Sequence, residues 1–208
     1  MTKFSRVLRN ATLISLVLTA PVFAATPAED FIRDNVQRAL AILGNSSLSH
    51  DDKRQQFEDF LKSLTDVRRI ALFMLGPVAK TAASDDVDAF VEAFRDYTDA
   101  VYEKQLSEYS GQSLSVTGSI ERAPGDFVVR TTIVDPHARR SAADSEVDFR
   151  VRDAGGKLVV TDASVHGVWL AIDEREQFTA YLAQHNSDVK ALAADLHRRA
   201  ADIRANES

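Results

Sequence analysis

One group of residues has the types needed for nucleophilic catalysis: Asp162, Ser164 and His166. A carboxylate, a hydroxyl and an imidazole in hydrogen-bond contact can activate the hydroxyl as a nucleophile. Here the three residues are spaced two apart in a stretch that alternates like a β-strand. Their side chains therefore point in parallel, about 6.6 Å apart along the strand. Hydrogen bonds of about 3 Å are hard to make in series at that spacing, so the pattern argues against a catalytic relay.

The other residues that could do chemistry are isolated. His137 follows Asp135 and Pro136, a combination typical of a strand end and a turn. The histidines show no metal-ligand spacing, and the motifs of phosphate-binding loops, nucleophile elbows, dinucleotide sites and zinc proteases are missing from the sequence. We therefore predict no catalytic residue, no metal site and no cofactor. The alternative is a small enzyme that uses His166, Asp162 or His137 as an acid or base.

The composition of the chain is that of one globular domain. It has 208 residues, of which 45% are apolar and 27% are charged. Disulfide frameworks and thiolate metal sites are excluded because the chain has no cysteine. The net charge of −6 and the scattered Lys and Arg residues argue against nucleic-acid binding.

Residues 1–24 have the pattern of a secretory signal peptide. Three positive residues precede a short apolar run at 11–20, which is too short for the roughly 20 residues of a membrane span. Val22 and Ala24 place small residues where a signal peptidase cuts, so we expect cleavage after Ala24, with Ala25 as the second choice. A single-span anchor is the alternative. The expected mature protein is one domain, 25–208, exported to the periplasm without stable membrane insertion.

Hydrophobic periodicity divides the mature chain into a helical half, a strand half and a helical tail. A period near 3.6 predicts helices at 27–43, 49–64, 67–75, from 84 or 85 to before 111, at 175–184 and at 188–203. A period of two predicts strands at 113–120, 127–134, 146–152 and 157–165, with a hairpin turn at 153–156. Short connections make neighbouring strands antiparallel. The expected fold is α+β, with a curved four-stranded antiparallel sheet covered on one face by helices.

The inward-facing residues of this fold have two interpretations. The apolar residues of the sheet and of the long helix must pack against something. Spacing does not distinguish a filled core from a hollow one, because both need the same residues facing inward. A solid core would suit a periplasmic adaptor protein, and a hollow one would suit a carrier.

Five stretches of the chain resemble a known family. They are 66–76 (DVRRIALFMLG), 90–94 (FVEAF) with Tyr102, 109–112 (YSGQ), 147–152 (VDFRVR) followed by 156–162 (GKLVVTD), and 165–168 (VHGV). In this order they resemble the MlaC or toluene-tolerance family of periplasmic phospholipid-binding proteins. Two features depart from its pattern: Val159 replaces a common Trp, and 169–175 (WLAIDER) replaces the usual continuation. This tail is closer to the branch associated with hopanoid biosynthesis, which leaves the lipid open.

The resemblance implies a fold like that of nuclear transport factor 2, with a deep pocket between the sheet and the helices for the acyl chains. It implies a non-enzymatic, monomeric carrier of phospholipid or a hopanoid-type lipid. Its partners would be an inner-membrane ABC transporter complex and an outer-membrane lipoprotein complex. The family's lipid-binding positions correspond here to apolar residues of the third helix, the long helix and the sheet. They are Ile70, Phe73, Met74, Leu75, Phe90, Phe94, Tyr97, Val101, Val129, Val147, Phe149, Val151, Val160, Val165 and Val168. We add Trp169 at the expected mouth of the pocket.

Overall fold

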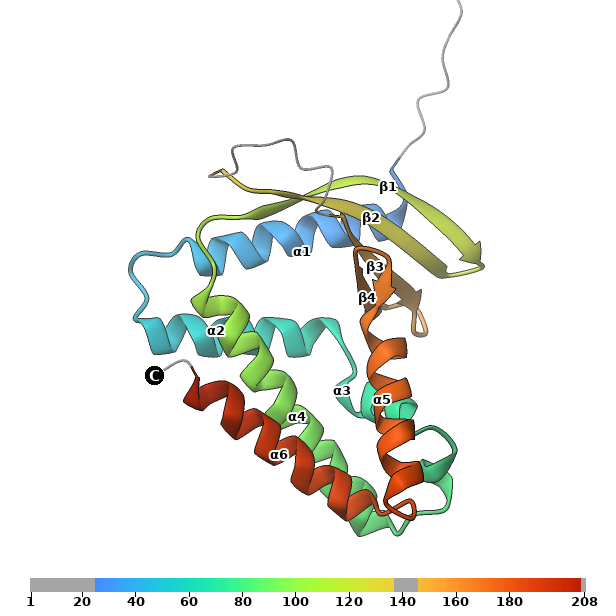
Figure 1. The fold of residues 1–208 in the computed structure, drawn as a ribbon. Coiled ribbons are helices and arrows are strands. Elements are labelled where there is room, and N and C mark those ends of the chain that lie inside the picture. Colours follow the sequence, from blue (N-terminus) through green and yellow to red (C-terminus); the bar gives the residue numbers. More distant parts are fainter. Residues whose placement is uncertain (1–24, 137–145, 207–208) are drawn as a thin grey trace, which may run out of the picture.

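The computed structural model describes residues 25–136 and 146–206 (Figure 1). The expected signal peptide, 1–24, and His137 lie outside these residues. The helices are α1 (Pro27–Leu43), α2 (His50–Leu64), α3 (Val67–Leu75), the short 3-10 helix η1 (Gly76–Lys80), α4 (Ser84–Ser107), α5 (Leu170–Gln184) and α6 (Val189–Ala205). The strands are β1 (Ser113–Ala123), β2 (Asp126–Val134), β3 (Glu146–Asp153), β4 (Leu158–Val165) and β5 (Val168–Trp169).

The strands form one antiparallel sheet in the order β1-β2-β3-β4-β5. This confirms the predicted antiparallel α+β fold and adds a fifth strand. The fifth strand is short and pairs with the end of β4 through Ser164 and Val165. The sequence pattern missed it because a strand of two residues shows no alternation. α5 was expected from 175 and instead begins directly after this strand, at Leu170.

Local side chains define where several helices begin. Thr26, Ser49, Asp66 and Asp188 each accept a hydrogen bond from the backbone N–H three residues further on, at the starts of α1, α2, α3 and α6. These bonds satisfy N–H groups that have no partner inside the helix. α3 ends at Gly76, whose φ of 57° suits glycine. The capping residues therefore define where these four helices begin.

α1 covers one face of the sheet. Its residues Ala28 and Ile32 form a buried cluster with Val129 of β2 and Val151 of β3. The start of the helix is also tied to β1, because Ser119 Oγ donates to Glu29 Oε1 at 2.7 Å and lies 2.9 Å from Thr26 Oγ1. We call the buried cluster formed by α1, β2 and β3 the sheet core.

α3, α4, α5 and α6 form a second buried cluster, which we call the helical core. At its centre Phe90 of α4 and Phe178 of α5 meet edge to face, with ring centroids 5.9 Å apart. Leu192 and Leu196 of α6 are also fully buried here. Full burial of each such side chain contributes about 1.5–3 kcal/mol. This core therefore holds the four helices together without the sheet.

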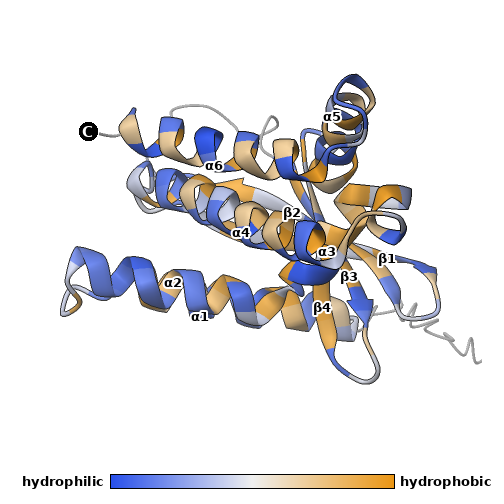
Figure 2. Ribbon diagram, turned by 90° about the horizontal axis from the view of Figure 1, so that it is seen from below, coloured by the Kyte–Doolittle hydropathy of each residue, from blue (hydrophilic) through white to orange (hydrophobic). Residues whose placement is uncertain are grey.

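The two cores are separate clusters within the described part of the chain. Figure 2 shows the hydrophobic parts of α3 and β4 close together where the helices meet the sheet, whereas α2 is largely hydrophilic. A domain of this size usually has one contiguous core. A binding site is therefore expected in the space between the two cores.

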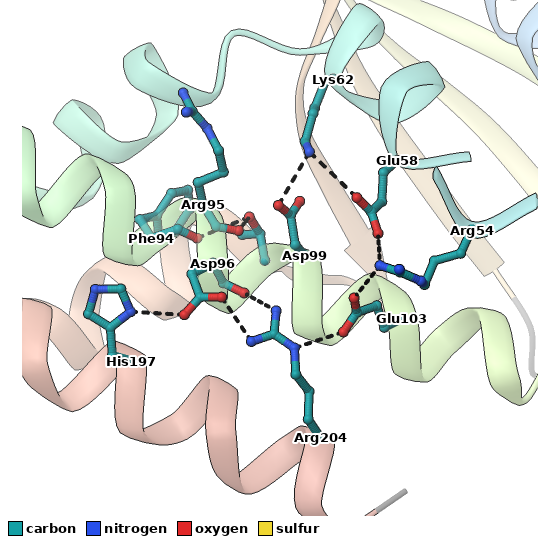
Figure 3. A network of polar contacts seen from close by, with 11 residues as sticks. Arg54, Glu58, Lys62, Phe94, Arg95, Asp96, Asp99, Glu103, His197 and Arg204 are labelled. Carbon is teal, nitrogen blue, oxygen red and sulfur yellow. Dashed lines mark hydrogen bonds and ion pairs between the residues drawn. The ribbon is translucent and has the colours of Figure 1, made fainter. Parts of the chain in front are cut away.

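A charged network links α2 to α4 and α4 to α6, with its side chains between the helices (Figure 3). Arg54 and Lys62 of α2 bond to Glu103 and Asp99 of α4 at 2.8 and 3.3 Å. From α6, Arg204 reaches both Glu103 and Asp96 at 2.8 Å, and His197 Nδ1 lies 2.8 Å from Asp96 Oδ2. Since Phe60 is the buried residue of α2, much of the attachment of this helix to α4 is ionic.

Candidate functional site

A cleft of about 320 Å³ lies between the two cores, with walls from α3, α4, β4 and α5. Val160 of β4 packs with the sheet core, whereas Ile70 of α3 and Tyr97 of α4 pack with the helical core. All three line the cleft. Ligand pockets in proteins occupy about 300–1,000 Å³. The interior is therefore hollow enough to take a small apolar group between the cores.

The cleft wall is mostly apolar. The lining residues that the sequence predicted for lipid binding are Ile70, Met74, Phe94, Tyr97, Val101 and Val160. They come from α3, α4 and β4, so the fold brings together residues far apart in the sequence. Two turns of α4, from Phe94 to Val101, form one side of the cleft because residues three and four apart share a helix face.

A smaller and more polar pocket of about 180 Å³ adjoins the cleft. The two spaces share Ile70, Val160, Thr161, Asp162 and Ala171 as lining residues. The polar lining of the smaller pocket includes three arginines, Arg69 of α3 and Arg150 and Arg152 of β3, and the carboxylates of Asp66 and Asp162. An apolar cleft that continues into a pocket with charged side chains can hold a molecule with an apolar part and a polar part.

Asp126 partly neutralises these arginines. Its carboxylate accepts two hydrogen bonds from Arg150, at 3.0 and 2.7 Å, and one from Arg152 at 2.7 Å. The hydrogen bonds from Arg150 hold the pKa of Asp126 well below its ordinary value, and those from Arg152 add to the effect. The Arg152 Nε atom is buried without a hydrogen-bond partner. Arg69 of α3 adds a positive charge to the pocket beyond the pairs that Arg150 and Arg152 form with Asp126.

Large apolar side chains surround the opening of the two spaces. Phe73 is 43% exposed, Leu170 is 49% exposed and Ile172 is 43% exposed. Phe73 and Ile172 line the polar pocket, and Leu170 lines the cleft. Arg175 lies over the Phe73 ring, 4.5 Å from its centroid. These residues form an exposed apolar rim at the entrance.

Three carboxyl groups lie along the cleft, from Asp162, Asp173 and Glu174. Burial raises the pKa of Glu174, while Arg199 partly opposes the shift and Asp173 adds to it. Burial also raises the pKa of Asp162, against the hydrogen bonds donated by the Ala171 and Ala163 backbone N–H groups. Among the described residues lining the cleft there is no Lys or Arg. The cleft itself is therefore suited to neutral apolar groups and unsuited to an anion.

The family described as MlaC protein matches residues 33–198, which is most of the chain. The chain belongs to the MlaC family. The match includes α3, α4, β4 and α5, and therefore every wall of the cleft. It also extends beyond the five stretches that carried the resemblance in the sequence.

A solved structure is similar in fold to most of this chain. It is the phospholipid-binding protein from Ralstonia solanacearum, in complex with a phospholipid. The two structures agree with a TM-score of 0.71 and 21% sequence identity, and the match covers 87% of this chain and 99% of the other. At this identity the likeness concerns the fold. It confirms the arrangement of helices on an antiparallel sheet.

The remaining predicted positions of this MlaC-family chain lie elsewhere in the fold. Leu75 and Phe90 are buried in the helical core. Val129 and Val151 are buried in the sheet core, with Phe149 packed against it. Three residues lie at the β4–β5 edge: Val165 and Val168 are exposed, and Trp169 is partly exposed. Phe73 is on the rim, and Val147 is partly buried between Thr131 and Val165 in the sheet.

Several residues that line the cleft were missed by the sequence analysis as lipid-binding positions. They are Thr65, Thr98, Tyr102, Thr161, Asp162, Ala163, Leu170, Ala171, Asp173 and Glu174. Thr98 and Tyr102 lie on the same face of α4 as Phe94 and Val101. A search by helix face rather than by hydrophobicity would have found them. The helix-face pattern does not identify the polar residues of α5 as lining residues, because their position depends on how α5 packs.

The Asp162, Ser164 and His166 group does not form a catalytic relay. Asp162 Oδ1 accepts hydrogen bonds from Ala163 and Ala171 N–H at 2.8 and 2.9 Å, which ties β4 to the start of α5. Ser164 is 2% exposed inside the sheet. His166 lies beyond the end of β4 with a φ of 51°. The change of backbone direction at His166 breaks the strand alignment that the sequence pattern predicted.

Two properties of the described residues complete the site. Within 25–136 and 146–206, no group of three or more His, Asp or Glu side chains is arranged to hold a metal ion. None of the helices in that part of the chain is long and apolar enough to cross a membrane.

Proposed function

We propose that this MlaC-family protein is a non-enzymatic lipid carrier that holds the acyl part of a phospholipid, or of a related lipid such as a hopanoid, in the central cleft. The observation that carries the proposal is the apolar cleft between the two cores, lined from both sides. The phospholipid complex of the Ralstonia solanacearum protein, which has the same fold, supports it.

The physical need for such a carrier follows from the lipid. A two-chain lipid has about 30 methylene groups, and moving each into water costs about 0.8 kcal/mol, so free transfer of the lipid costs on the order of 25 kcal/mol. A carrier must hide most of that apolar surface. The cleft and its exposed apolar rim provide such a surface, with Phe73, Leu170 and Ile172 where the lipid would enter.

The polar end of the lipid would lie in the pocket of Arg69, Arg150 and Arg152, where a phosphate can accept hydrogen bonds from guanidinium groups. With Asp66, Asp126 and Asp162 nearby, the pocket is close to neutral overall. It is therefore better suited to a zwitterionic head group than to one with several negative charges.

The cellular role is part of the proposal. Residues 1–24 would direct export, and the mature domain, 25–208, would work as a monomer in the periplasm. It would receive lipid from, or deliver it to, an inner-membrane ABC transporter complex and an outer-membrane lipoprotein complex. The MlaC family membership and the cleft support this role.

The experiment that tests the proposal is native mass spectrometry of the full chain purified from cells, followed by solvent extraction. A carrier is expected to show adducts with the mass of intact lipids, and the extract identifies them. An adaptor protein would show the mass of the bare chain, which would contradict the proposal.

A further inference from the structure

A second cavity of about 450 Å³ lies beyond the central cleft, between α1, α2, the end of α4 and the first strands of the sheet. Its walls are mainly large apolar side chains, from Val36, Leu40, Leu43, Phe57, Leu114 and Ile133. None of these residues was expected to bind lipid. None of them is among the buried residues of the sheet core or of the helical core. A cavity of this size and lining can hold an apolar group.

The two spaces lie in sequence along one face of α4. Thr98 and Tyr102 line the central cleft, and Gln105 lines the second cavity. Residues spaced by four and three positions share one side of a helix. The boundary between the spaces therefore falls at Tyr102, one turn before Gln105. Burial raises the pKa of the Tyr102 hydroxyl, with Asp99 a smaller cause, and the residue as a whole is partly exposed.

α2 forms a wall of the second cavity through Phe57, and Thr65, just after the end of α2, lines the central cleft. Between them Phe60 is buried and packs 6.1 Å from the Phe57 ring. The ion pairs of Arg54 and Lys62 hold α2 against α4. The second cavity thus lies between α2 and the end of α4, and the chain that leaves α2 continues to the cleft.

The lengths of the two spaces decide what they can hold. The cleft wall on α4, from Phe94 to Tyr102, rises about 12 Å at 1.5 Å per residue, and extending it to the C-cap residue Glu108, which lines the second cavity, gives about 21 Å. The hydrocarbon part of one membrane leaflet is about 15 Å thick, half of the bilayer core. A membrane-length acyl chain is therefore longer than the central cleft and shorter than the two spaces together.

We propose that the second cavity receives the terminal methylene groups of a long acyl chain that passes Tyr102, so that Tyr102 divides the acyl site and the second cavity selects for chain length. This inference rests on the proposed function, because it requires the rest of the chain to lie in the central cleft. The polar pocket, the cleft and the second cavity then form one track from head group to chain end.

Filling the second cavity with a bulky side chain directly tests whether the cavity selects for acyl-chain length. Ala39 of α1 lines the cavity, whereas Ala41 of the same helix is exposed and lines no cavity described here. The probes are dipalmitoylphosphatidylcholine in vesicles and the short-chain dioctanoylphosphatidylcholine in solution. Ala39→Trp should lower loading of the long-chain lipid at least about tenfold, since each buried methylene is worth a factor of about four. Loading of the short-chain lipid should stay near that of the wild type, and Ala41→Trp should match the wild type for both.

A second measurement uses the unchanged protein. A phosphatidylcholine with a photoreactive diazirine at the end of a palmitoyl chain should crosslink to α1 and α2, at peptides containing Leu40 or Phe57. Crosslinks confined to α3, α4 and β4, or an Ala39→Trp protein that keeps long-chain loading, would overturn the second cavity's role and leave the carrier function standing. Failure of the wild type to load either lipid would overturn the carrier function itself.

Discussion

The Arg54 guanidinium of α2 lies 2.8 Å from the Glu103 carboxylate of α4, and this ion pair links two helices that line the second cavity. Glu103 is also bonded to Arg204 of α6 at 2.8 Å (Figure 3). One carboxylate therefore connects α2 to the helices of the buried helical core.

Weakening this ion pair should make lipid exchange faster. Arg54→Gln is expected to raise the rate at which bound fluorescent phospholipid moves to acceptor vesicles, because α2 then separates from α4 more often. The free energy of unfolding should fall by about 1 kcal/mol or less, since ion pairs with exposed partners contribute little. High salt should have a similar effect on the wild-type rate.

Lys104→Gln is the matched control, because it removes one positive charge from exposed α4 surface and takes part in no ion pair described here. It should exchange lipid at the wild-type rate. Equal rates for Arg54→Gln and Lys104→Gln would show that α2 does not limit release.

Glu174 should destabilise the folded protein at neutral pH. Burial raises its pKa above the ordinary 4.5, so the folded protein keeps a proton that the unfolded chain releases. The stabilising effect of that proton is complete below pH 4.5 and is lost as the pH rises through the folded pKa. Glu174→Gln should therefore raise the Tm at pH 7 and leave it unchanged below pH 4.5. The exposed Glu176→Gln should change the Tm at neither pH.

Lipid binding should be tighter at lower pH. An acyl chain in the cleft removes more water from the Asp162 and Glu174 carboxyls, whose pKa values burial already raises. Further loss of water raises both pKa values again, so binding takes up protons. Titration of the empty protein with dioctanoylphosphatidylcholine is expected to give a lower Kd at pH 5 than at pH 7, with a smaller difference for Glu174→Gln. An affinity that does not change between these pH values would contradict this prediction.

Asp162 should stabilise the folded protein rather than act as a catalytic residue. Asp162→Ala removes the acceptor of the Ala163 and Ala171 N–H groups, and an unpaired buried group costs about 1–3 kcal/mol. The Tm should fall accordingly, as measured by thermal unfolding. His166→Ala should leave lipid loading unchanged, because His166 lines no cavity described here. Loss of lipid transfer in a folded His166→Ala protein would favour the enzyme alternative.

Sequence periodicity predicted the elements of the fold because each amphipathic face must be buried. It could not predict which buried face meets a core and which meets a cavity. Phe90 and Phe94 show the limit, since they share a helix face and both contact Phe178. Phe94 also lines the cleft, whereas Phe90 is fully buried in the helical core and lines no part of the cleft.

The polar part of the site could not be predicted from the sequence for a different reason. Arg150 lies on the alternate face of β3 from Phe149, so alternation assigns it to solvent. It instead faces a pocket, together with α3 and α5. The position of these helices depends on packing between distant segments, for which hydrophobic spacing gives no signal.

The measurement that most directly tests the carrier account is the amount of lipid phosphorus bound to two purified variants of α4. Thr98 lines the cleft and Ala89 is exposed on the same helix. If the space between the cores holds the lipid, Thr98→Trp should retain roughly tenfold less lipid than the wild type, given a loss of about 1.4 kcal/mol or more. Ala89→Trp should retain the wild-type amount. A folded Thr98→Trp protein that carries as much lipid as Ala89→Trp would contradict the account.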